Sequence, residues 1–521
     1  MVTTTDPGHG NYSFRRGVRT WIVGDHVAKP EDRPNDQFSF VPLVATINGG
    51  LGETIANGLA DHLREALAKT PPSPARREVP HFLVAYAGQG GRTIEELSKA
   101  DESTDRRTPA VKQNGGGFYK TSLDDARRAK EQARVHGKDF QIAALVWMQG
   151  EANGGPQGGI VPSRWKPELP RPAGQEWYRD RLIAYRKQWS DDLRVITGQA
   201  GEIPMFTYQT LGPAGEAQLM AVDGDSNLYM VGPHYMVPSA LNSRRAGSYG
   251  APIHLSADGQ RWYGEQVAKV VRRVVVEGEA WRPLRPRKAE IDSSRSSVLV
   301  DFLVPRPPLV IDEHFFPKEQ SETAGGFSSL CGFQIQNSAG ARPALTAVEV
   351  ESSTRVRIKL AAPLPSGEQY FVSYGLPFAG KIGAIGRIRN GSESESQRTT
   401  ELLIPGAWPE RLKPLLAEGV FSVANTLAGG SFAQAPVRYV REENGSTVLR
   451  FENRERRNKV DFAAEQTLIA QRPFPYGNLR DSDPETAIYR FTDTAYGTRG
   501  GEPYPLWNWC VLFSQFSISQ R

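Results

Sequence analysis

The sequence predicts an α/β fold with a doubly wound parallel sheet, followed by an antiparallel β-sandwich, and three observations support this fold class. Short apolar runs alternate with amphipathic helical patterns in the first half of the chain. After about Pro283 the pattern changes to alternating apolar and polar residues with turn residues between the runs. The chain has 521 residues, which suits roughly two to four domains. Strands spaced by crossover helices indicate a parallel sheet, whereas period-two alternation indicates antiparallel strands.

The first half supplies the elements of the parallel sheet. The expected strands are 81–88, 140–150, 203–210 and 227–233, and the expected helices are 53–70, 122–138, 174–198 and 256–278. Ser122 and Ser256 are expected N-caps, because a serine oxygen accepts an N–H bond that the start of a helix leaves unpaired. Gly137 is expected to end the helix that begins at Ser122, because glycine readily takes the left-handed conformation found after a helix.

The second half supplies the elements of the sandwich. Expected strands lie in 289–305, 332–336, 345–364 and 368–376, and strand patterns return in 476–484 and 504–518. Between these groups the pattern is mixed, with a helix expected in 409–429 and a strand in 446–456. We therefore predict an α/β domain over 1–282, a β-sandwich over 283–382 and 473–521, and an α+β insertion over 383–472. In this arrangement the sandwich closes only with the C-terminal strand.

Composition and charge exclude several classes of protein. Lys and Arg exceed Asp and Glu by only 63 to 58, and the densest basic run, 454–459, lies among polar and acidic residues. We therefore expect no nucleic-acid partner. No apolar stretch approaches the roughly 20 residues that span a bilayer, so we expect no membrane insertion. The first residues lack the apolar segment of a signal peptide, so none is expected.

Cysteine and histidine usage argues against a disulfide framework and against a metal enzyme. The two cysteines, Cys331 and Cys510, can be two buried thiols or one bridge. The eight histidines are scattered, without an HExxH motif or a close cluster with carboxylates, so we expect no metal enzyme. His234, which follows the expected strand 227–233, is the histidine to examine for a metal site, although a loop histidine is the simpler interpretation.

Three polar motifs stand at positions where a doubly wound sheet binds its ligands, outside the carboxyl ends of its strands. The run 88–93, GQGGRT, is neither a P-loop nor GxGxxG, but its glycines can bring a backbone N–H close to an oxyanion. Gln149-Gly150-Glu151 follows the second expected strand, and an amide there can donate to developing negative charge. His254 lies just before an expected helix, a suitable position for a general base. Each motif alone fits an ordinary turn, and the specific signal is their order and spacing.

Together these motifs resemble the SGNH hydrolase superfamily, in its branch of sialate and carbohydrate O-acetylesterases. The block WMQGEAN (147–153) resembles the branch's Trp-x-Gln-Gly-Glu-x-Asp/Asn pattern, Gly91-Arg92-Thr93 its Gly-x-Thr, and 251–265 its histidine block. The resemblance covers about residues 10–277, and it implies a flavodoxin-like strand order. The segments VDFLVPRPPLVID (300–312), YGNLRDSD (476–483) and YPLWNW (504–509) are also similar to tailed-phage virion proteins in which a β-sandwich follows the hydrolase.

The resemblance implies hydrolysis of an acyl ester without metal or cofactor. A serine would attack the acetyl carbonyl, and His254 would take its proton. The N–H of Gly91 and the side chain of Gln149 would stabilise the oxyanion, and Glu151 would orient neighbouring groups or the histidine. The implied substrate is an O-acetylated polysaccharide or other glycan.

Two departures from the family pattern bear on activity. The family's nucleophile sits in a Gly-Gln-Ser or Gly-Asp-Ser turn after the first strand, whereas the only serines before Glu53 are Ser13 and Ser39, in other contexts. Ala251 stands where the family has an aspartate, three residues before the histidine. A missing first strand would leave unpaired edges inside the sheet. The segment 18–23 could fill that place, another chain could supply strand and serine, or the natural protein could extend upstream of Met1.

Two functions of different classes remain open. The first is a phage tail or virion-associated O-acetylesterase that acts on surface glycan, with other tail proteins or further copies of itself as partners and the virion as its location. The second is a structural or glycan-binding virion protein that keeps the hydrolase fold without its chemistry. The missing serine turn and Ala251 favour the second function.

Overall fold

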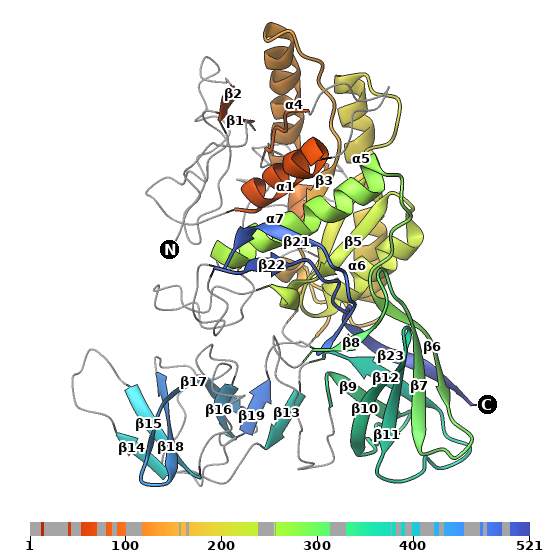
Figure 1. Cartoon of the computed structure of the whole chain (residues 1–521), viewed down its shortest axis with the longest axis vertical. Helices are drawn as coiled ribbons and strands as arrows, with labels where there is room; N and C mark the ends of the chain where they lie inside the picture. The colour runs from red at the N-terminus through yellow and green to blue at the C-terminus, as the bar shows by residue number, and fades with distance from the viewer. Residues whose placement is uncertain are drawn as a thin grey trace.

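The protein is represented by a computed structural model (Figure 1). The residues that the structure describes are 12–14, 40–42, 54–69, 80–85, 91–99, 117–155, 158–162, 166–237, 255, 257–312, 330–376, 378–381, 387–390, 399–406, 421–426, 432–452, 469–472, 477–491 and 501–520.

The first half contains a parallel sheet of three strands in the order β3, β4, β5. The strands are β3 (Leu145–Trp147), β4 (Met205–Gln209) and β5 (Leu228–Pro233). The main helices around them are α1 (Ile55–Lys69), α4 (Gly117–Val135), α5 (Ala173–Thr197), α6 (Pro213–Gly224) and α7 (Ala257–Val271). The mixed α/β architecture with a parallel sheet is thus as predicted from the sequence, and its doubly wound order remains a prediction.

Helices cover both faces of this sheet. Consecutive residues of β4 point to opposite sides, so their packing partners show what covers each face. Met205 packs in a cluster with side chains of α4, α5 and α6, among them Tyr178. Phe206 packs in a second cluster with side chains of α1 and α7, among them Leu59 and Val267. All five residues of β4 are buried, which is typical of a parallel strand between two helical layers.

Two details of the α/β half differ from the sequence prediction. In the described part of the expected strand 81–88, only Leu83 forms a β-bridge. Helix α4 begins at Gly117, so Ser122 lies inside it and its hydroxyl donates to the carbonyl of Tyr119 at 2.6 Å. The predicted cap at Ser122 is therefore wrong, because the packing of Tyr119 in the core extends the helix backwards. Gly137 follows the helix with a left-handed φ of 63°, as expected, and Ser256 lies outside the described residues.

The second half contains a curled sheet of seven strands in the order β10-β11-β7-β6-β23-β12-β9. Its strands are β6 (Arg285–Ile291), β7 (Ser297–Leu303), β9 (Phe333–Asn337), β10 (Leu345–Ser352), β11 (Arg355–Leu360), β12 (Tyr370–Tyr374) and β23 (Phe513–Gln520). The C-terminal strand β23 lies between β6 and β12 and joins the two parts of this single sheet. It runs parallel to β6, so the sheet is mixed rather than purely antiparallel.

A further sheet of seven antiparallel strands forms between residues 378 and 472, in the order β13-β19-β16-β17-β18-β15-β14. Its strands are β13 (Phe378–Lys381), β14 (Arg387–Asn390), β15 (Thr399–Pro405), β16 (Phe421–Thr426), β17 (Phe432–Glu443), β18 (Ser446–Glu452) and β19 (Ile469–Arg472). The helix predicted over 409–429 is wrong for β16, which pairs with β17 along its whole length. Cross-strand pairing here outweighs a helix-like composition. The predicted domain boundaries remain predictions.

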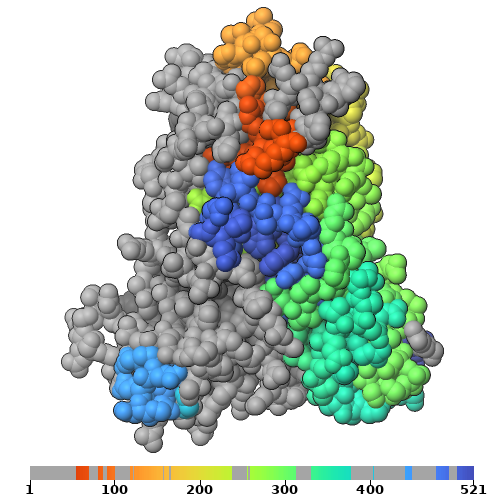
Figure 2. Space-filling model, viewed as in Figure 1, coloured from red at the N-terminus to blue at the C-terminus, as the bar shows by residue number. Residues whose placement is uncertain are grey.

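The described residues from 477 to 512 form a segment that we call the C-terminal strap. It includes β20 (Leu479–Arg480), β21 (Thr486–Arg490) and β22 (Pro503–Pro505). Although they are close to the C-terminus in sequence, β21 and β22 lie against α1 and α7 of the α/β half (Figures 1 and 2). Trp262 of α7 stacks on Tyr504 of the strap with ring centroids 5.5 Å apart. The strap therefore shares a hydrophobic core with the α/β half.

Both cysteines are buried and free, so the interpretation as two thiols is confirmed over the disulfide bridge. Among the described helices, none has the length and apolar character needed to cross a bilayer.

Candidate functional site

Two of the three polar motifs meet at the carboxyl end of β3. The side-chain amide of Gln149, Nε2, donates to the carbonyl oxygen of Arg92 at 3.0 Å, across 57 residues of sequence. Asn153 completes the junction, because its Oδ1 accepts the backbone N–H of Ile94 at 3.0 Å. The blocks around Gly91 and Gln149, which the sequence places far apart, are therefore held against each other by amide hydrogen bonds.

Gln149 is buried and its side chain is fully engaged. Besides the bond to Arg92, Nε2 donates to Oδ1 of Asn153 at 2.6 Å. Its Oε1 accepts the hydroxyl of Tyr178 at 2.6 Å, and its backbone carbonyl accepts Nε2 of Gln218 at 2.5 Å. An amide has two N–H donors, so both are used inside the protein. As arranged here, Gln149 fixes the geometry of the loop, and an oxyanion could take an N–H only in exchange for one of these bonds.

Glu151 is held at one end of its carboxylate. Its Oε1 accepts hydrogen bonds from the hydroxyls of Tyr208 and Thr210, which stand at the carboxyl end of β4. Burial, and next the nearby charge of Glu151, raise the pKa of Tyr208 well above its usual value, so this hydroxyl stays a donor. Among the described residues, Oε2 of Glu151 has no hydrogen-bond partner, and the side chain is only partly buried. One carboxylate oxygen is thus fixed, while the other can accept a further donor.

Gly150 permits the tight turn between these two side chains. Its φ of 151° lies in the region that favours glycine. A Cβ at this position would stand 2.3 Å from Cγ2 of Thr210, closer than any real contact. The glycine in the Gln-Gly-Glu block therefore lets the strand end approach the threonine that holds Glu151.

Gly91, Arg92 and Thr93 form the start of the short helix α2 (Ile94–Leu97). Gly91 has a left-handed φ of 66° and is exposed. The backbone N–H of Thr93 donates to the carboxylate of Glu96 at 2.9 Å, which closes a capping box. Gly91 is thus presented at the surface, next to the loop that Gln149 holds.

The structure does not join the third motif to the other two. His254 and Ala251 lie outside the described residues, as does Ser39, and only the backbone of Ser13 is described, in β1 (Tyr12–Phe14). The assignments of His254 as base and of Gly91, Gln149 and Glu151 as its partners therefore remain predictions.

His234 lies at the same edge of the sheet. It begins the short 3-10 helix His234–Met236 after β5 and is buried. Its ring centroid is 5.6 Å from that of Tyr208, whose hydroxyl contacts Glu151. The structure contains no group of three histidine, cysteine or acidic residues arranged for a metal among the residues it describes. His234 is thus a packed neighbour of the site, and the absence of a metal remains a prediction.

Sequence reasoning missed the residues that hold the two motif side chains in place. These residues are Tyr178, Tyr208, Thr210 and Gln218. The position of Tyr208 and Thr210 at the end of an expected parallel strand was a usable signal. Tyr178 and Gln218 lie within α5 and α6, and no local pattern distinguishes them from other core-facing residues.

A pocket with a volume of about 450 Å³ opens in the loop that follows Asn153. It is lined by Gly158, Gly159, Glu168, Pro170 and Arg171. This volume falls in the range of about 300–1,000 Å³ that is common for small-molecule sites. Its charged groups have opposite signs, so the lining suits a neutral polar ligand better than an ion.

No protein-family model and no curated protein sequence matches the chain. Among solved structures, the chain is similar to a carbohydrate acetylesterase from Xanthomonas citri, with a TM-score of 0.39 and 18% identity over 70% of this chain and 68% of that one. It is also similar to the S-layer protein SbsC, with a TM-score of 0.14 and 11% identity over 68% of this chain and 52% of that one. Similarities this low do not establish a common fold or activity, so the function has to be argued from the residues of this chain.

Proposed function

We propose that this protein is an SGNH-type carboxylic ester hydrolase that removes acetyl groups from a glycan. The observation that carries the proposal is the 3.0 Å bond from Gln149 Nε2 to the carbonyl of Arg92. This bond brings the Gly-x-Thr and Gln-Gly-Glu blocks to the carboxyl end of one parallel strand, where α/β folds bind their ligands. Two short motifs can match a family by sequence without lying close together in the fold, so their contact here is independent support.

The proposed reaction proceeds in two steps. A serine oxygen attacks the acetyl carbonyl carbon while His254 takes the serine proton, and the oxyanion accepts the N–H of Gly91. The sugar oxygen leaves with the proton returned by His254. Water then attacks the acetyl-serine, again with His254 as base, which releases acetate and restores the serine. We assign no serine to the nucleophile's role.

Glu151 and Gln149 have different roles in this proposal. Oε1 of Glu151 is fixed by Tyr208 and Thr210, so its Oε2 can accept the ring N–H of a histidine and orient it, in place of the aspartate that Ala251 replaces. Gln149 would contribute to the oxyanion hole only by exchanging its bond to Arg92 or Asn153 for one to the substrate. The pocket between Gly158 and Arg171, whose two charged residues Glu168 and Arg171 have opposite signs, would take part of the sugar.

A second candidate is a glycan-binding or structural protein that has lost the chemistry. The closed hydrogen bonding of Gln149 favours it, because an oxyanion hole normally presents donors that are free before the reaction. In either case we propose that the protein is a component of a phage tail or tail-like particle. Its target would be an O-acetylated surface polysaccharide. The sequence resemblance to virion proteins supports this location.

The deciding experiment is intact-mass analysis after treatment with a fluorophosphonate probe, beside hydrolysis of a small acetyl ester. The hydrolase predicts one covalent adduct, mapped to a single serine, and turnover that His254→Ala abolishes. His136→Ala is the matched control, because His136 is an exposed residue after α4 and is none of the proposed site residues, so the variant should keep full activity. No adduct and no turnover, with binding of an acetylated polysaccharide retained, would leave the binding protein as the function.

Gln149→Leu separates the two roles of the amide. If Gln149 serves only to hold the loop, the variant loses stability and its residual folded fraction keeps a normal kcat. If it also donates to the oxyanion, kcat falls by about 100-fold or more at unchanged KM. Either result decides only the role of the Gln149 side chain. The fluorophosphonate experiment decides separately whether the protein is a hydrolase.

A further inference from the structure

His62 forms a buried junction between the C-terminal strap and the α/β half. It lies on α1, and its ring Nδ1 is 2.8 Å from Oε2 of Glu265 on α7. Its Nε2 is 3.1 Å from Oε1 of Glu485, which belongs to the strap. His62 and Glu265 are almost inaccessible, with side chains 6% and 0% exposed, and Glu485 is 20% exposed. One imidazole therefore bridges carboxylates from two different parts of the chain.

This geometry needs a protonated ring. A neutral imidazole has one N–H donor and one lone pair, whereas a histidinium has two N–H donors. Both neighbours of His62 are carboxylates, which can only accept when ionised. A neutral His62 would therefore point a lone pair at one of the two, inside a region with little water to screen the contact.

Glu265 also holds the strap through its backbone. The N–H of Ile488 donates to Oε2 at 2.6 Å, and the N–H of Tyr489 donates to Oε1 at 2.9 Å. The hydroxyl of Tyr489 donates to Asp61 of α1 at 2.7 Å. The orientation of the Glu265 carboxylate, which His62 helps to set, thus determines how β21 docks on the two helices.

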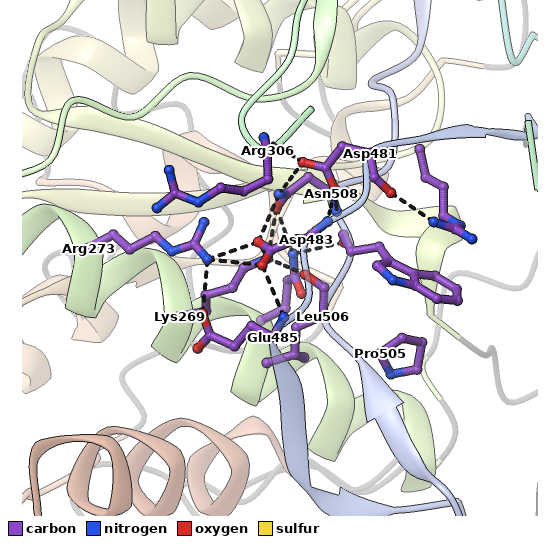
Figure 3. Close-up of polar contacts among 12 residues, drawn as sticks. Lys269, Arg273, Arg306, Asp481, Asp483, Glu485, Pro505, Leu506 and Asn508 are labelled. Atoms are coloured by element: carbon purple, nitrogen blue, oxygen red, sulfur yellow. Dashed lines mark hydrogen bonds and ion pairs between the residues drawn. The ribbon is translucent and has the colours of Figure 1, made fainter. Parts of the chain in front are cut away.

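The other charges around this junction form one connected network with it. Arg272 donates to both oxygens of Glu485, at 2.9 and 2.8 Å. Arg273 bridges Glu485 and Asp483, and Lys269 also contacts Asp483 (Figure 3). The titratable and charged groups of this network around His62 and its two carboxylates are Asp61 on α1, Arg261, Glu265 and Lys269 on α7, Arg272 and Arg273 on the π-helix Arg272–Val276 that follows it, and Asp483, Glu485 and Tyr489 on the strap.

We propose that protonated His62 is a latch that fastens the C-terminal strap to helices α1 and α7, and that a rise in pH releases it. Release would weaken the docking of β21 first, because its backbone bonds end on Glu265. The strap also reaches the candidate site, since the backbone of Leu512 exchanges two hydrogen bonds with the side chain of Gln209, at 2.7 and 2.6 Å. The latch stands independently of the ester hydrolase proposal.

The direction of the pH effect follows from the contacts. Burial alone would lower the pKa of His62, but the hydrogen bonds and charges of Glu265 and Glu485 outweigh it and raise this pKa above 6.5. A histidine whose pKa rises on folding adds stability that is fully present below the unfolded value and is lost as pH rises through the folded value. Burial lowers the pKa of Lys269. The titration of Lys269 therefore has the opposite sign and cannot produce a loss of docking at higher pH.

The test is hydrogen–deuterium exchange of the full chain from about pH 6 to about pH 9, corrected for the intrinsic exchange rate. The reporters are the amides of Ile488 and Tyr489, which bond to Glu265, and the amides of β4 serve as the internal reference. Between the unfolded and the folded pKa of His62, release of one proton on opening predicts that opening rises by about tenfold per pH unit in β21 relative to β4. An equal dependence on pH in both segments of the wild-type protein would overturn the proposal without any variant.

His62→Gln provides the specific variant, because the glutamine amide does not titrate and keeps one donor group and one acceptor oxygen at every pH. We expect weaker protection of Ile488 and Tyr489 at about pH 6 and the loss of the excess pH dependence. His136→Gln, at an exposed position, should behave like the wild type. If His62→Gln fails to fold, Glu485→Gln removes only the carboxylate on the strap side and should reduce the pH dependence of the same two amides. Unchanged pH dependence in a folded variant at either position would contradict the latch.

Discussion

Lys269→Met tests whether the strap and the α/β half are held together by buried charge. Lys269 is 0% exposed, and its ammonium group donates to Asp483 at 3.0 Å, to Asn508 at 2.8 Å and to the carbonyl of Leu506. All three acceptors belong to the strap (Figure 3). Methionine keeps much of the apolar stem but removes every one of these bonds.

The size of the effect can be worked from these contacts. Removal of one partner of a buried ion pair costs about 3–5 kcal/mol when it leaves an uncompensated charge. Here Arg273 remains 2.9 Å from Asp483, so the anion keeps a partner. The remaining loss falls on Asn508 and the Leu506 carbonyl, at about 1–3 kcal/mol for each buried polar group left unpaired. We therefore expect the free energy of unfolding to fall by about 3 kcal/mol, at the lower end of the range for buried pairs.

The assay is denaturant unfolding followed by tryptophan fluorescence. The matched control is Lys359→Met, because Lys359 pairs with Glu349 at 2.7 Å but the two side chains are 45% and 50% exposed. An exposed pair should contribute no more than about 1 kcal/mol. The two lysines make ion pairs of similar length, so the comparison isolates burial. A loss for Lys269→Met within about 1 kcal/mol of the control would refute the reasoning, because the buried charges would then not hold the strap.

Three further predictions concern the candidate site and the domain boundary. Tyr208→Phe keeps the ring packing but removes one bond to Glu151, so kcat/KM for an acetyl ester should fall by roughly 10-fold or more, and the free energy of unfolding should fall by no more than the roughly 1.5–3 kcal/mol of a bond to a charged group. Gly150→Ala should lower the free energy of unfolding by about 1–3 kcal/mol or more, because Gly150 has a positive φ and a Cβ there would clash with Thr210. Thermal or denaturant unfolding measures this loss, and normal stability would contradict that geometry. A chain that ends at Arg282 should aggregate in size-exclusion chromatography, because it loses the strap that covers α1 and α7, and a monodisperse fragment would show that the α/β half folds alone.

The sequence predicted those elements whose pattern is local. Helix α1 has apolar residues at helical spacing, and β4 lies in the short strand-like run IPMFTYQT (203–210), so both were found close to their observed bounds. The start of α4 was missed, because the buried Tyr119, three residues before Ser122, extends the helix, and burial of that side chain is a long-range effect. The strand β16 was predicted as a helix for a similar reason, since only its pairing with β17 decides its conformation.

In the candidate site, too, some residues could be predicted from the local sequence and others depend on long-range contacts. Gln149 and Glu151 were found because they interrupt an apolar run at the end of a strand, which is visible in the sequence. The hydroxyls that hold them come from elements 29 to 59 residues away, and no period in the sequence connects these positions. The engagement of both N–H groups of Gln149 was equally invisible, because it depends on the distance between two loops.

The contacts of the strap show that a change in the sequence pattern does not have to coincide with a boundary between independently folding domains. The alternation changes near Pro283, yet Lys269 and Glu265, which precede that point, bond to residues after 480. A buried ammonium group cannot be desolvated favourably until its carboxylate arrives. The last turns of α7 therefore reach their final structure only together with the strap. Because the strap leads directly into β23, which joins the two parts of the curled sheet, closure of that sheet and completion of the α/β core are expected to be one cooperative event.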